Sequence, residues 1–453
     1  MRGLTEELVR EISARKNEPK WMLDLRLKGV KYWYELEMPK WAPDISEVDL
    51  DNIEMYVNPQ AETVDSWEKV PVDIRETFDK LGIPEAEKDR LAGVGAQYDS
   101  EVVYHNLKES VAELGVVYLP MEEAVALSTK ENEKYKKEFG IDIKKMVREH
   151  FMKLVPVNDH KFAALHAAVY SGGSFIYVPK GASVEVPLQS YYRLNAPGAG
   201  QFEHTLIIVD DEAALHFIEG CSAPKYNVAN LHAGCVEVYV GKHAHMKFST
   251  VESWSKNMYN LNTKRATVDE GGAMEWVTGS FGSRVSMMYP TTILAGRGAK
   301  MEYSGVTFAG ATQNLDTGSN AIHLAPETSS VMSQKSISKD GGRSMTRTMS
   351  YIAPEATNSK TFINCKSLIL SPNSISDAVP ELRVHCKDAE ASHEASVGKV
   401  SEEIIQYLMS RGISEDTAVA MVVRGFTSDI SKELPIEYAM EMNNLIRLEM
   451  ENG

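Results

Sequence analysis

The sequence predicts a mainly β protein in which a β-solenoid is flanked by helical regions at both ends. Three observations lead to this fold class. The middle of the chain alternates apolar and polar residues with a period of two, and a strand-like unit recurs there about every 30 residues. The two ends of the chain instead carry helical spacing and helix-capping signals. We therefore expect helical regions at 1–155 and 398–453 around a β core at 156–397.

The N-terminal region, residues 1–155, is expected to be helical and irregular. An amphipathic helix starts at Glu6, and Thr5 is placed to cap it. Pro39, Pro43 and Pro59 then predict a long irregular segment, because proline interrupts regular structure. Residues 130–149 predict a heavily charged helix whose charges form a solvated face.

Five copies of the repeated unit can be aligned in the middle of the chain. Each copy has an apolar residue, a polar or glycine-containing turn, a small anchor residue and an apolar–polar–apolar triplet. The anchors are Ala182, Ala213, Ala244, Gly272 and Ala299, at spacings of 31, 31, 28 and 27 residues. A fixed period without helical spacing inside the unit favours one solenoid coil per copy. A β-sandwich is the alternative, although a sandwich need not repeat at a fixed length.

The alternation also predicts which side chains each coil places inside. Positions +2 and +4 from the anchor are apolar in every copy, so this face is expected in the interior, because successive side chains of a strand point to opposite faces. The same parity puts polar residues at +6 and +8 inside, among them Glu219, Cys221 and Glu252. Neighbouring strands lie ~4.8 Å apart, so Cys221 and Glu252 would be adjacent, with Trp254 on their face. If the alternation slips after +4, these residues face solvent.

Buried carboxylates are costly without partners, so Glu219 and Glu252 need cations, and Lys264 and Arg193 are the candidates. A polar interior stabilises a solenoid poorly, and we therefore interpret this column as a functional conduit. Cys235 is expected to be a packed strand residue, whereas Cys386 could be a ligand or a packed residue. The sequence has no Cys-x-x-Cys pair, which argues against a stable structural zinc site. His204, His232, His243 and His323 are each expected to be satisfied polar residues.

The C-terminal region, residues 398–453, predicts three helices. The first begins after Ser401 and ends at Gly412, and the second begins after Ser414 and ends near Gly425. Pro435 lies in the first turn of the third. A helical bundle at a chain terminus is a common docking surface for a partner.

The composition limits the classes of function. With 48 Lys and Arg against 64 Asp and Glu, the net charge is −16, which disfavours nucleic acid and anionic membranes as partners. No apolar run reaches the ~18 residues of a membrane helix, and the first residues contain no apolar stretch of signal-peptide length. Four cysteines do not make a disulfide scaffold, so a cytoplasmic protein with reduced thiols is expected. A Walker A motif is absent, so ATP hydrolysis would need a separate subunit.

Segments along most of the chain resemble the SufB/SufD family of the SUF iron–sulfur cluster assembly machinery. They are residues 219–224, 231–233, 247–251, 263–266, 316–318, 364–365 and 393–395. The resemblance implies an N-terminal helical region, a right-handed parallel β-helix and a C-terminal helical region that docks an ABC-type ATPase. It implies a scaffold for cluster assembly and not an enzyme.

The resemblance also implies roles for single residues. Cys221 corresponds to the cysteine that accepts sulfur as a persulfide. An internal sulfur path is implied for Arg193, Asn195, Glu203, Glu252, Trp254 and Lys264. Cys365 would lie near a subunit interface where the nascent cluster forms, with His393 and Glu394 as further candidate ligands. The chemistry fits, because a thiolate is the sulfur nucleophile, a nearby Lys or Arg lowers the pKa of a thiol, and cluster iron prefers thiolates.

The cargo implied by the resemblance is a transient iron–sulfur cluster, and the participation of a reduced flavin is left open. The implied partners are the ATPase SufC, a SufD or second SufB-type subunit, a sulfur donor such as SufS with SufE or SufU, and apo iron–sulfur proteins. The presence of both Cys221 and Cys365 favours the SufB branch. The alternatives are a SufD-like subunit and a β-solenoid carbohydrate-active enzyme, which would place its acidic pairs on an exposed face.

Overall fold

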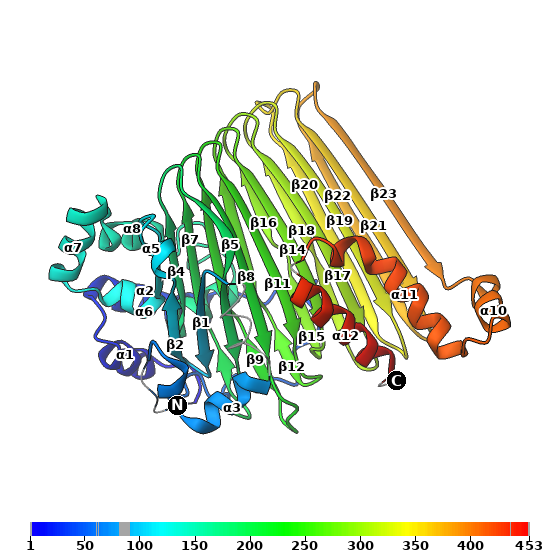
Figure 1. Cartoon of the computed structure of the whole chain (residues 1–453), viewed down its shortest axis with the longest axis horizontal. Coiled ribbons are helices and arrows are strands. Elements are labelled where there is room, and N and C mark those ends of the chain that lie inside the picture. Colours follow the sequence, from blue (N-terminus) through cyan, green and yellow to red (C-terminus); the bar gives the residue numbers. More distant parts are fainter. Residues whose placement is uncertain (1, 60, 62, 81–90, 435, 452–453) are drawn as a thin grey trace.

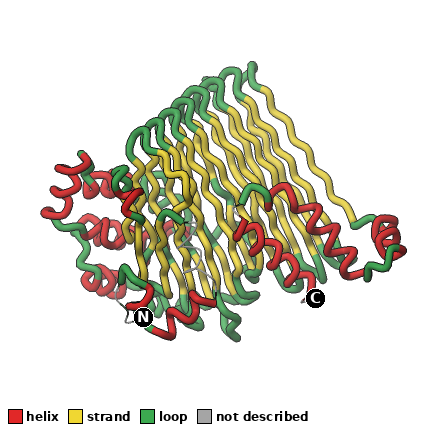
Figure 2. The backbone as a smooth tube through the Cα atoms, viewed as in Figure 1, coloured by secondary structure: helices red, strands yellow, loops and turns green. Residues whose placement is uncertain are grey.

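The computed structural model describes residues 2–59, 61, 63–80, 91–434 and 436–451. Its centre is a β-solenoid in which long strands are stacked coil upon coil, with helices at both ends of the chain (Figures 1 and 2). The predicted mainly β solenoid is therefore confirmed. Among the described residues, no helix combines the length and the apolar character that a membrane crossing requires.

Two sheets form the walls of the solenoid. The first sheet contains, in spatial order, β2 (Glu101–Leu107), β1 (Gly93–Tyr98), β5 (Ser183–Arg193), β8 (Ala214–Ser222), β11 (His245–Ser253), β14 (Ala273–Phe281), β17 (Lys300–Ala309), β19 (Ser329–Ser338), β21 (Lys360–Ile369) and β23 (Glu390–Lys399). From β5 onwards each strand pairs in parallel with its neighbour, as expected when every coil contributes one strand to the sheet.

The second sheet contains, in spatial order, β3 (Val117–Pro120), β4 (Gly173–Val178), β7 (His204–Val209), β10 (Cys235–Val240), β13 (Thr263–Val268), β16 (Thr291–Leu294), β18 (Asn314–His323), β15 (Val285–Met288), β12 (Met258–Asn260), β9 (Asn230–His232) and β6 (Gly200–Gln201). Beyond β18 it continues through β20 (Arg343–Ile352) to β22 (Ile375–Val384). The long strand β18 pairs with both β15 and β16, which joins two narrower series of strands.

The repeated turn has a physical basis in its backbone. A residue with positive φ directly precedes every anchor of the repeat: Gly181, Glu212, His243, Gly271 and Gly298. Glycine adopts this left-handed conformation readily, and other residues pay roughly 1 kcal/mol for it. The turn is therefore retained even where glycine is absent, and it keeps successive coils in register.

The interior agrees with the predicted parity, with one exception in the first coil. The +2 and +4 side chains of the four later copies are all buried. In β5, however, the register shifts between Val184 and Leu188, so that Leu188 pairs with Phe217. Val186, predicted to lie inside, is 42% exposed because it lies in this bulge. The equal spacing of the first three anchors, 31 residues in each interval, hid the irregularity.

The C-terminal helices are α10 (Glu402–Ser410), α11 (Glu415–Ser431) and α12 (Ile436–Glu451). Apolar side chains of α11 and α12 pack on the outer face of the first sheet, against Val251, Val277 and Val306 (Figure 1). The prediction that the second helix ends near Gly425 is wrong, since α11 runs on to Ser431. The packing of its later residues offsets the ~1 kcal/mol cost of an internal glycine. Pro435 lies outside the described residues.

The N-terminal region contains several helices, most of which pack against the second sheet, whereas the helix at Val72–Lys80 packs against β1 and β2 of the first sheet. They are α1 (Glu6–Arg15), α2 (Lys20–Glu35), α3 (Val72–Lys80), α5 (Glu109–Ala112), α6 (Met121–Ala126), α7 (Thr129–Phe139), α8 (Ile143–His150) and α9 (Lys161–Val169), with a 3-10 turn at Trp67–Lys69. Thr5 caps α1 by accepting a hydrogen bond from the Leu8 amide, as predicted. The charged stretch forms two helices, α7 and α8, because Gly140 ends the first in a left-handed conformation.

Candidate functional site

Two neighbouring rows of buried side chains run along the inner face of the first sheet. One row, here called the Glu219 row, contains Glu219, Thr250, Thr278, Gly305, Gln334 and Cys365, each directly paired with the next. The other, the Cys221 row, contains Cys221, Glu252, Ser280, Thr307, Ser336 and Ser367. Every residue of both rows is buried. The predicted polar interior is therefore present, and it extends well beyond the coils recognised in the sequence.

The two rows connect two cysteines. Cys221 lies on β8 and Cys365 on β21, and β11, β14, β17 and β19 lie between them. Five strand spacings correspond to roughly 24 Å along the solenoid. Side-chain hydrogen bonds link much of the interval, including Gln334 to Thr307 at 2.9 Å and Ser336 to Ser367 at 2.8 Å.

Cys221 lies in a tightly closed environment. Its side chain packs with Tyr192, Leu194, Trp254 and Met258 and is 1% exposed. Burial raises the pKa of the Cys221 thiol well above its ordinary value, and the nearby carboxylates raise it further. Lys264 acts in the opposite direction but does not compensate. The expectation that a neighbouring cation would lower the pKa of this thiol is therefore wrong for this conformation, because desolvation and the acidic neighbours outweigh the lysine.

Lys264 is the buried cation of the interior. It extends from β13 in the second sheet across to Glu219 in the first, and the two form an ion pair in which both side chains are almost fully buried. The ammonium group also donates to the Thr250 hydroxyl at 2.8 Å and lies 4.8 Å from the centroid of the Phe248 ring. The predicted pairing of Lys264 with Glu219 is confirmed. The other carboxylate oxygen of Glu219 has no hydrogen-bond partner among the described residues.

A second network joins Glu203 to Glu252. His232 donates from Nε2 to Glu203 at 2.5 Å and from Nδ1 to Asn260 at 2.7 Å, and Asn260 donates to Glu252 at 2.9 Å. Burial alone would lower the pKa of His232, but Glu203 and Asn260 raise it to about 9. His232 is therefore a cation at neutral pH. Burial raises the pKa of Glu252, while Lys264 and His232 act in the opposite direction.

Trp254 belongs to the same group of side chains. Its ring lies beside that of His232, with centroids 4.7 Å apart, and its Nε1 has no hydrogen-bond partner in the described part of the chain. The structure thus brings Cys221, Glu203, Glu252, Trp254 and Lys264 into one buried region. Lys264 lies on the second sheet and Glu203 in a loop. They reach the side chains of the first sheet only because each coil folds the two sheets against each other.

Arg193 and Asn195 lie elsewhere. Arg193 pairs in register with Ser222 and donates to its hydroxyl at 2.9 Å, on the face of β5 opposite to Tyr192, which points inward. Asn195 follows the strand, and its backbone amide donates to Asp99 at 2.6 Å. Both residues are half-buried. The expectation that Arg193 neutralises an interior carboxylate is therefore wrong, because Arg193 lies an odd number of residues from the inward-facing Leu188 and Tyr192, and strand alternation places it on the outer face.

The three expected metal ligands are not assembled within this chain. Cys365 is buried on β21 and pairs with Ala395 of β23, so His393, two residues away, shares its face. Glu394 pairs with Asn364 and lies on the opposite face. Burial raises the pKa of the Cys365 thiol. His393 and Glu394 are both exposed on the last strand of the sheet.

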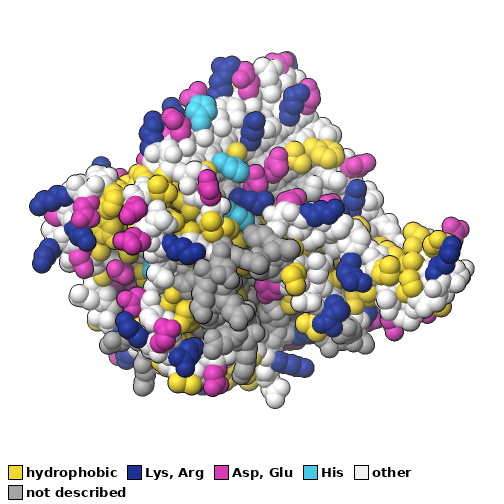
Figure 3. All heavy atoms as spheres, in the orientation of Figure 1, with side chains coloured by type: hydrophobic (Ala, Val, Ile, Leu, Met, Phe, Trp, Pro, Cys, Tyr) yellow, Lys and Arg dark blue, Asp and Glu magenta, His cyan; other side chains and the backbone are white. Residues whose placement is uncertain are grey.

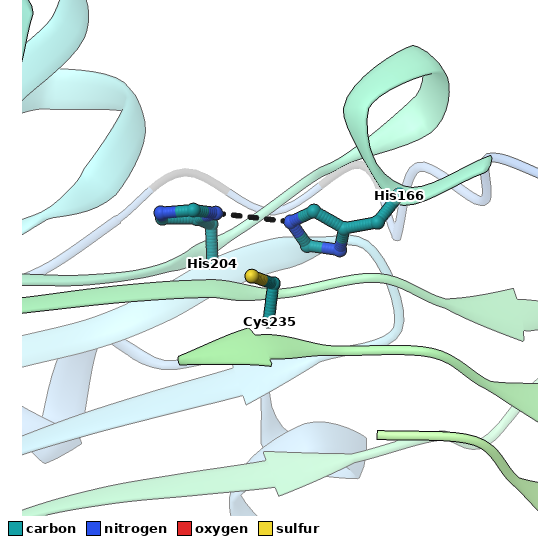
Figure 4. Close-up of side chains that lie close together, drawn as sticks. All are labelled: His166, His204 and Cys235. Atoms are coloured by element: carbon teal, nitrogen blue, oxygen red, sulfur yellow. Dashed lines mark hydrogen bonds between the residues drawn. The ribbon is translucent and has the colours of Figure 1, made fainter. Parts of the chain in front are cut away.

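Two features were missed in the sequence. His232 was expected to be an ordinary polar residue, and nothing in its three-residue strand β9 signals its link to Glu203. His166, His204 and Cys235 also meet in one buried cluster (Figure 4). No local motif joins these three residues, which come from α9, β7 and β10.

Comparisons with known proteins agree with this geometry. Residues 192–426 match the family model described as SUF system FeS cluster assembly, SufBD core domain. Iron–sulfur cluster assembly SufBD family proteins of Staphylococcus epidermidis, Staphylococcus aureus and Staphylococcus haemolyticus are each 49% identical over 452 residues. These matches cover 100% of this chain and 94% of each relative.

Proposed function

The chain belongs to the SufBD family of iron–sulfur cluster assembly proteins, and from this premise we propose that it is a SufB-type scaffold subunit of a SUF complex. As a component of cluster assembly it is not itself an enzyme. The observation that carries the proposal is the connection of Cys221 to Cys365 by the two rows of buried polar side chains. A SufD-like role is the alternative within the family, and the presence of both cysteines speaks against it.

In this proposal Cys221 receives sulfur from a donor persulfide. The Cys221 sulfur attacks the outer sulfur of the donor, the donor S–S bond breaks, and a new S–S bond forms on Cys221. The thiol proton leaves with the released donor thiolate, so the step is an exchange without net oxidation. Because Cys221 is 1% exposed and its pKa is raised, the transfer requires an opened state in which the donor reaches the sulfur. A donor system such as SufS with SufE or SufU fits this role.

Sulfur then passes along the interior towards Cys365. The charged groups Lys264 and His232 would hold an anionic sulfur species, and the hydroxyl groups of the two rows would donate hydrogen bonds to it. Glu203, Glu252 and Trp254 line the same region. Conversion of persulfide sulfur to sulfide consumes two electrons, so an external two-electron reductant of the reduced-flavin class is required. Nothing among the described residues assigns a flavin site.

We propose that the cluster forms at the open end of the solenoid. β22 and β23 are the last strands of the two sheets, and Ile375, Val379 and Val397 are exposed on them. Exposed apolar strand edges pair readily with another chain, and a SufD subunit or a second copy of this chain fits there. Cys365 and His393 share one face next to this edge. A partner would supply the ligands that this chain does not bring together, and loose ligation suits a cluster that is later given to apo-proteins.

The C-terminal region is proposed to dock the ATPase SufC. On α10, Ile404, Tyr407 and Met409 are exposed, and hydrophobic side chains gather at this end of the molecule (Figure 3). A cavity of about 540 Å³ separates α10 from the rim of the solenoid. Because α11 and α12 lie on the outer face of the strands that carry the two rows, movement of these helices by the ATPase would reach the interior directly.

The carbohydrate-active alternative loses its support in the structure. Glu219 and Glu252 are both 0% exposed, whereas hydrolysis of a polysaccharide needs carboxylates that a sugar chain can reach. Their buried position favours a cargo small enough to move inside the protein.

The proposal is tested by anaerobic cluster assembly with purified complex, a persulfide donor, ferrous iron and a reductant. Cys221→Ser and Cys365→Ser should each reduce the cluster absorbance by at least tenfold. Cys386→Ser should leave it unchanged, because this buried cysteine packs with Ile352, Ala353 and Ala356. Persulfide on Cys221, detected by mass spectrometry, should persist in Cys365→Ser. Normal assembly by Cys221→Ser would refute the SufB-type role. Truncation after Lys399 should abolish capture of the ATPase, and retained capture would refute the docking site.

A further inference from the structure

A buried cluster of His166, His204 and Cys235 lies outside the solenoid interior, beneath the N-terminal helices (Figure 4). One donor atom of each residue lies within 4.8 Å of the others, and all three side chains are at most 1% exposed. His204 and Cys235 are direct register partners on β7 and β10, and His166 reaches them from α9. The sulfur lies beside the gap between the two imidazole rings.

We propose that this cluster binds a divalent transition-metal ion of the zinc type, held by His166 Nε2, His204 Nδ1 and the Cys235 thiolate. Two imidazoles and one thiolate are a donor set that such ions prefer. The two ring nitrogens are 3.0 Å apart, and tetrahedral zinc with ~2.05 Å bonds needs roughly 3.4 Å between them. A small rotation of either ring and of the cysteine side chain would admit the ion.

The hydrogen bonds around the rings already have the arrangement that a bound metal needs. His166 Nδ1 lies 2.9 Å from the Ala233 carbonyl and therefore carries a proton, which leaves the lone pair on Nε2. This nitrogen faces His204 Nδ1. Metal-bound histidines usually donate their other nitrogen to a carbonyl or a carboxylate, which fixes the ring. Ala233 is such a partner for His166.

The carboxylate of Glu237 completes the arrangement on the other side. His204 Nε2 lies 3.2 Å from Glu237, yet this buried nitrogen makes no hydrogen bond within the described residues. Without a metal, neutral His204 donates its Nδ1 proton to Nε2 of His166, and the lone pair on its own Nε2 then points at the Glu237 carboxylate. With a metal on Nδ1, the proton moves to Nε2 and points at Glu237. A doubly protonated His204 is the metal-free alternative.

Glu237 is firmly held and balances the charge. It accepts hydrogen bonds from the backbone amides of Met152, Leu154 and Val155 at 2.5, 2.7 and 2.9 Å. A divalent ion, one thiolate and one carboxylate together are neutral, which suits a site closed off from water. The Phe151 ring stacks on His204 with centroids 3.9 Å apart and shields one side.

The ion would fasten α9 to the second sheet, since its ligands come from α9, β7 and β10. Binding to the folded chain alone would add to its stability. The site lies apart from Cys221 and Cys365, so the inference stands or falls independently of the proposed scaffold function. It also runs against two sequence-based expectations, that Cys235 is a packed strand residue and that the lack of a Cys-x-x-Cys pair argues against a stable structural zinc site.

The test uses the full chain, stripped of metal by a chelator and refolded anaerobically with one equivalent of Co²⁺. The wild-type chain should show d–d absorption and thiolate-to-cobalt charge-transfer absorption, and Zn²⁺ should abolish both. A variant that keeps Cys235 as its single cysteine (Cys221→Ser, Cys365→Ser and Cys386→Ser) should retain the bands, while Cys235→Ser should lose them. Zn²⁺ should raise the melting temperature of both chains that retain Cys235 by several degrees.

The absence of cobalt–thiolate bands from the single-cysteine variant would overturn the proposal. This outcome does not depend on whether the Cys235→Ser chain folds. Bands of equal intensity in a folded Cys235→Ser chain would overturn it as well, because the thiolate would then come from another cysteine. Loss of cluster assembly has no bearing on this result, since no cluster is formed in the experiment.

Discussion

Replacing Lys264 by methionine should expose the energetic cost of the interior charges. Methionine keeps most of the length of the side chain and its contact with the Phe248 ring, but it removes the only positive partner that contacts Glu219 among the described residues. Glu219 is 0% exposed, so its carboxylate cannot turn to water. It must either remain charged in the interior or take up a proton.

The free energy of protonating the Glu219 carboxylate is the upper limit of the stability that the variant loses by leaving this group unpaired. Protonating a carboxyl group with an ordinary pKa near 4.3 costs roughly 1.36 kcal/mol for each pH unit above that value, which gives about 3.7 kcal/mol at pH 7 and about 1 kcal/mol at pH 5. The first figure agrees with the ~3–5 kcal/mol observed when one partner of a buried ion pair is removed. Lys264→Met should therefore be strongly destabilised at pH 7 and only slightly at pH 5.

The measurement is equilibrium urea unfolding of wild type and variant at pH 5, 6 and 7. The double variant Lys264→Met with Glu219→Gln should show no such pH dependence relative to wild type. Lys242→Met is the matched control, because Lys242 pairs with Glu270 at 3.4 Å with both side chains 50% exposed, and its loss should stay below ~1 kcal/mol. An equal loss of stability by Lys264→Met at pH 5 and pH 7 would show that Glu219 is not the group left unpaired.

Four further substitutions test other parts of the structure by urea unfolding. Burial raises the pKa of Glu441 on α12 to about 7, so the folded chain holds a proton that the unfolded chain releases near pH 4.5. The free energy of unfolding should therefore fall by up to ~3 kcal/mol as the pH rises from 4.5 to 7. Glu441→Gln should remove this pH dependence. The pKa of His232 is raised to about 9, so its contribution should be complete below pH 6.5 and vanish as the pH passes 9; a pH-independent difference between wild type and His232→Gln would contradict the ion pair. Phe217→Ala should cost about 3–5 kcal/mol because its ring is fully buried. Val186→Ala, at the corresponding position of the bulged coil, should change stability by less than ~0.5 kcal/mol.

The local pattern of the sequence was sufficient for the fold class and for much of the interior. The anchors from Ala182 to Ala299 established the coil, and the parity of the strands was enough to place Cys221 beside Glu252. The pairing of Lys264 with Glu219 followed from the cost of burying a carboxylate. These properties depend on backbone geometry that each strand carries within itself.

The tertiary structure decided whatever depends on contacts between distant parts of the chain. The bulge between Val184 and Leu188 left Val186 exposed, and strand parity separated Glu394 from Cys365 at the end of the sheet. The pKa of His232 is raised by its hydrogen bond to Glu203, which lies in another coil.

The cluster of His166, His204 and Cys235 belongs to the same class of features. The three residues come from a helix and two strands that are far apart in the sequence, and each one alone resembles an ordinary packed or polar residue. Repetition and alternation are properties of the order of residues along the chain, so the sequence shows them directly. The packing of a helix on a sheet, and the meeting of two sheets across an interior, exist only once the coils have stacked.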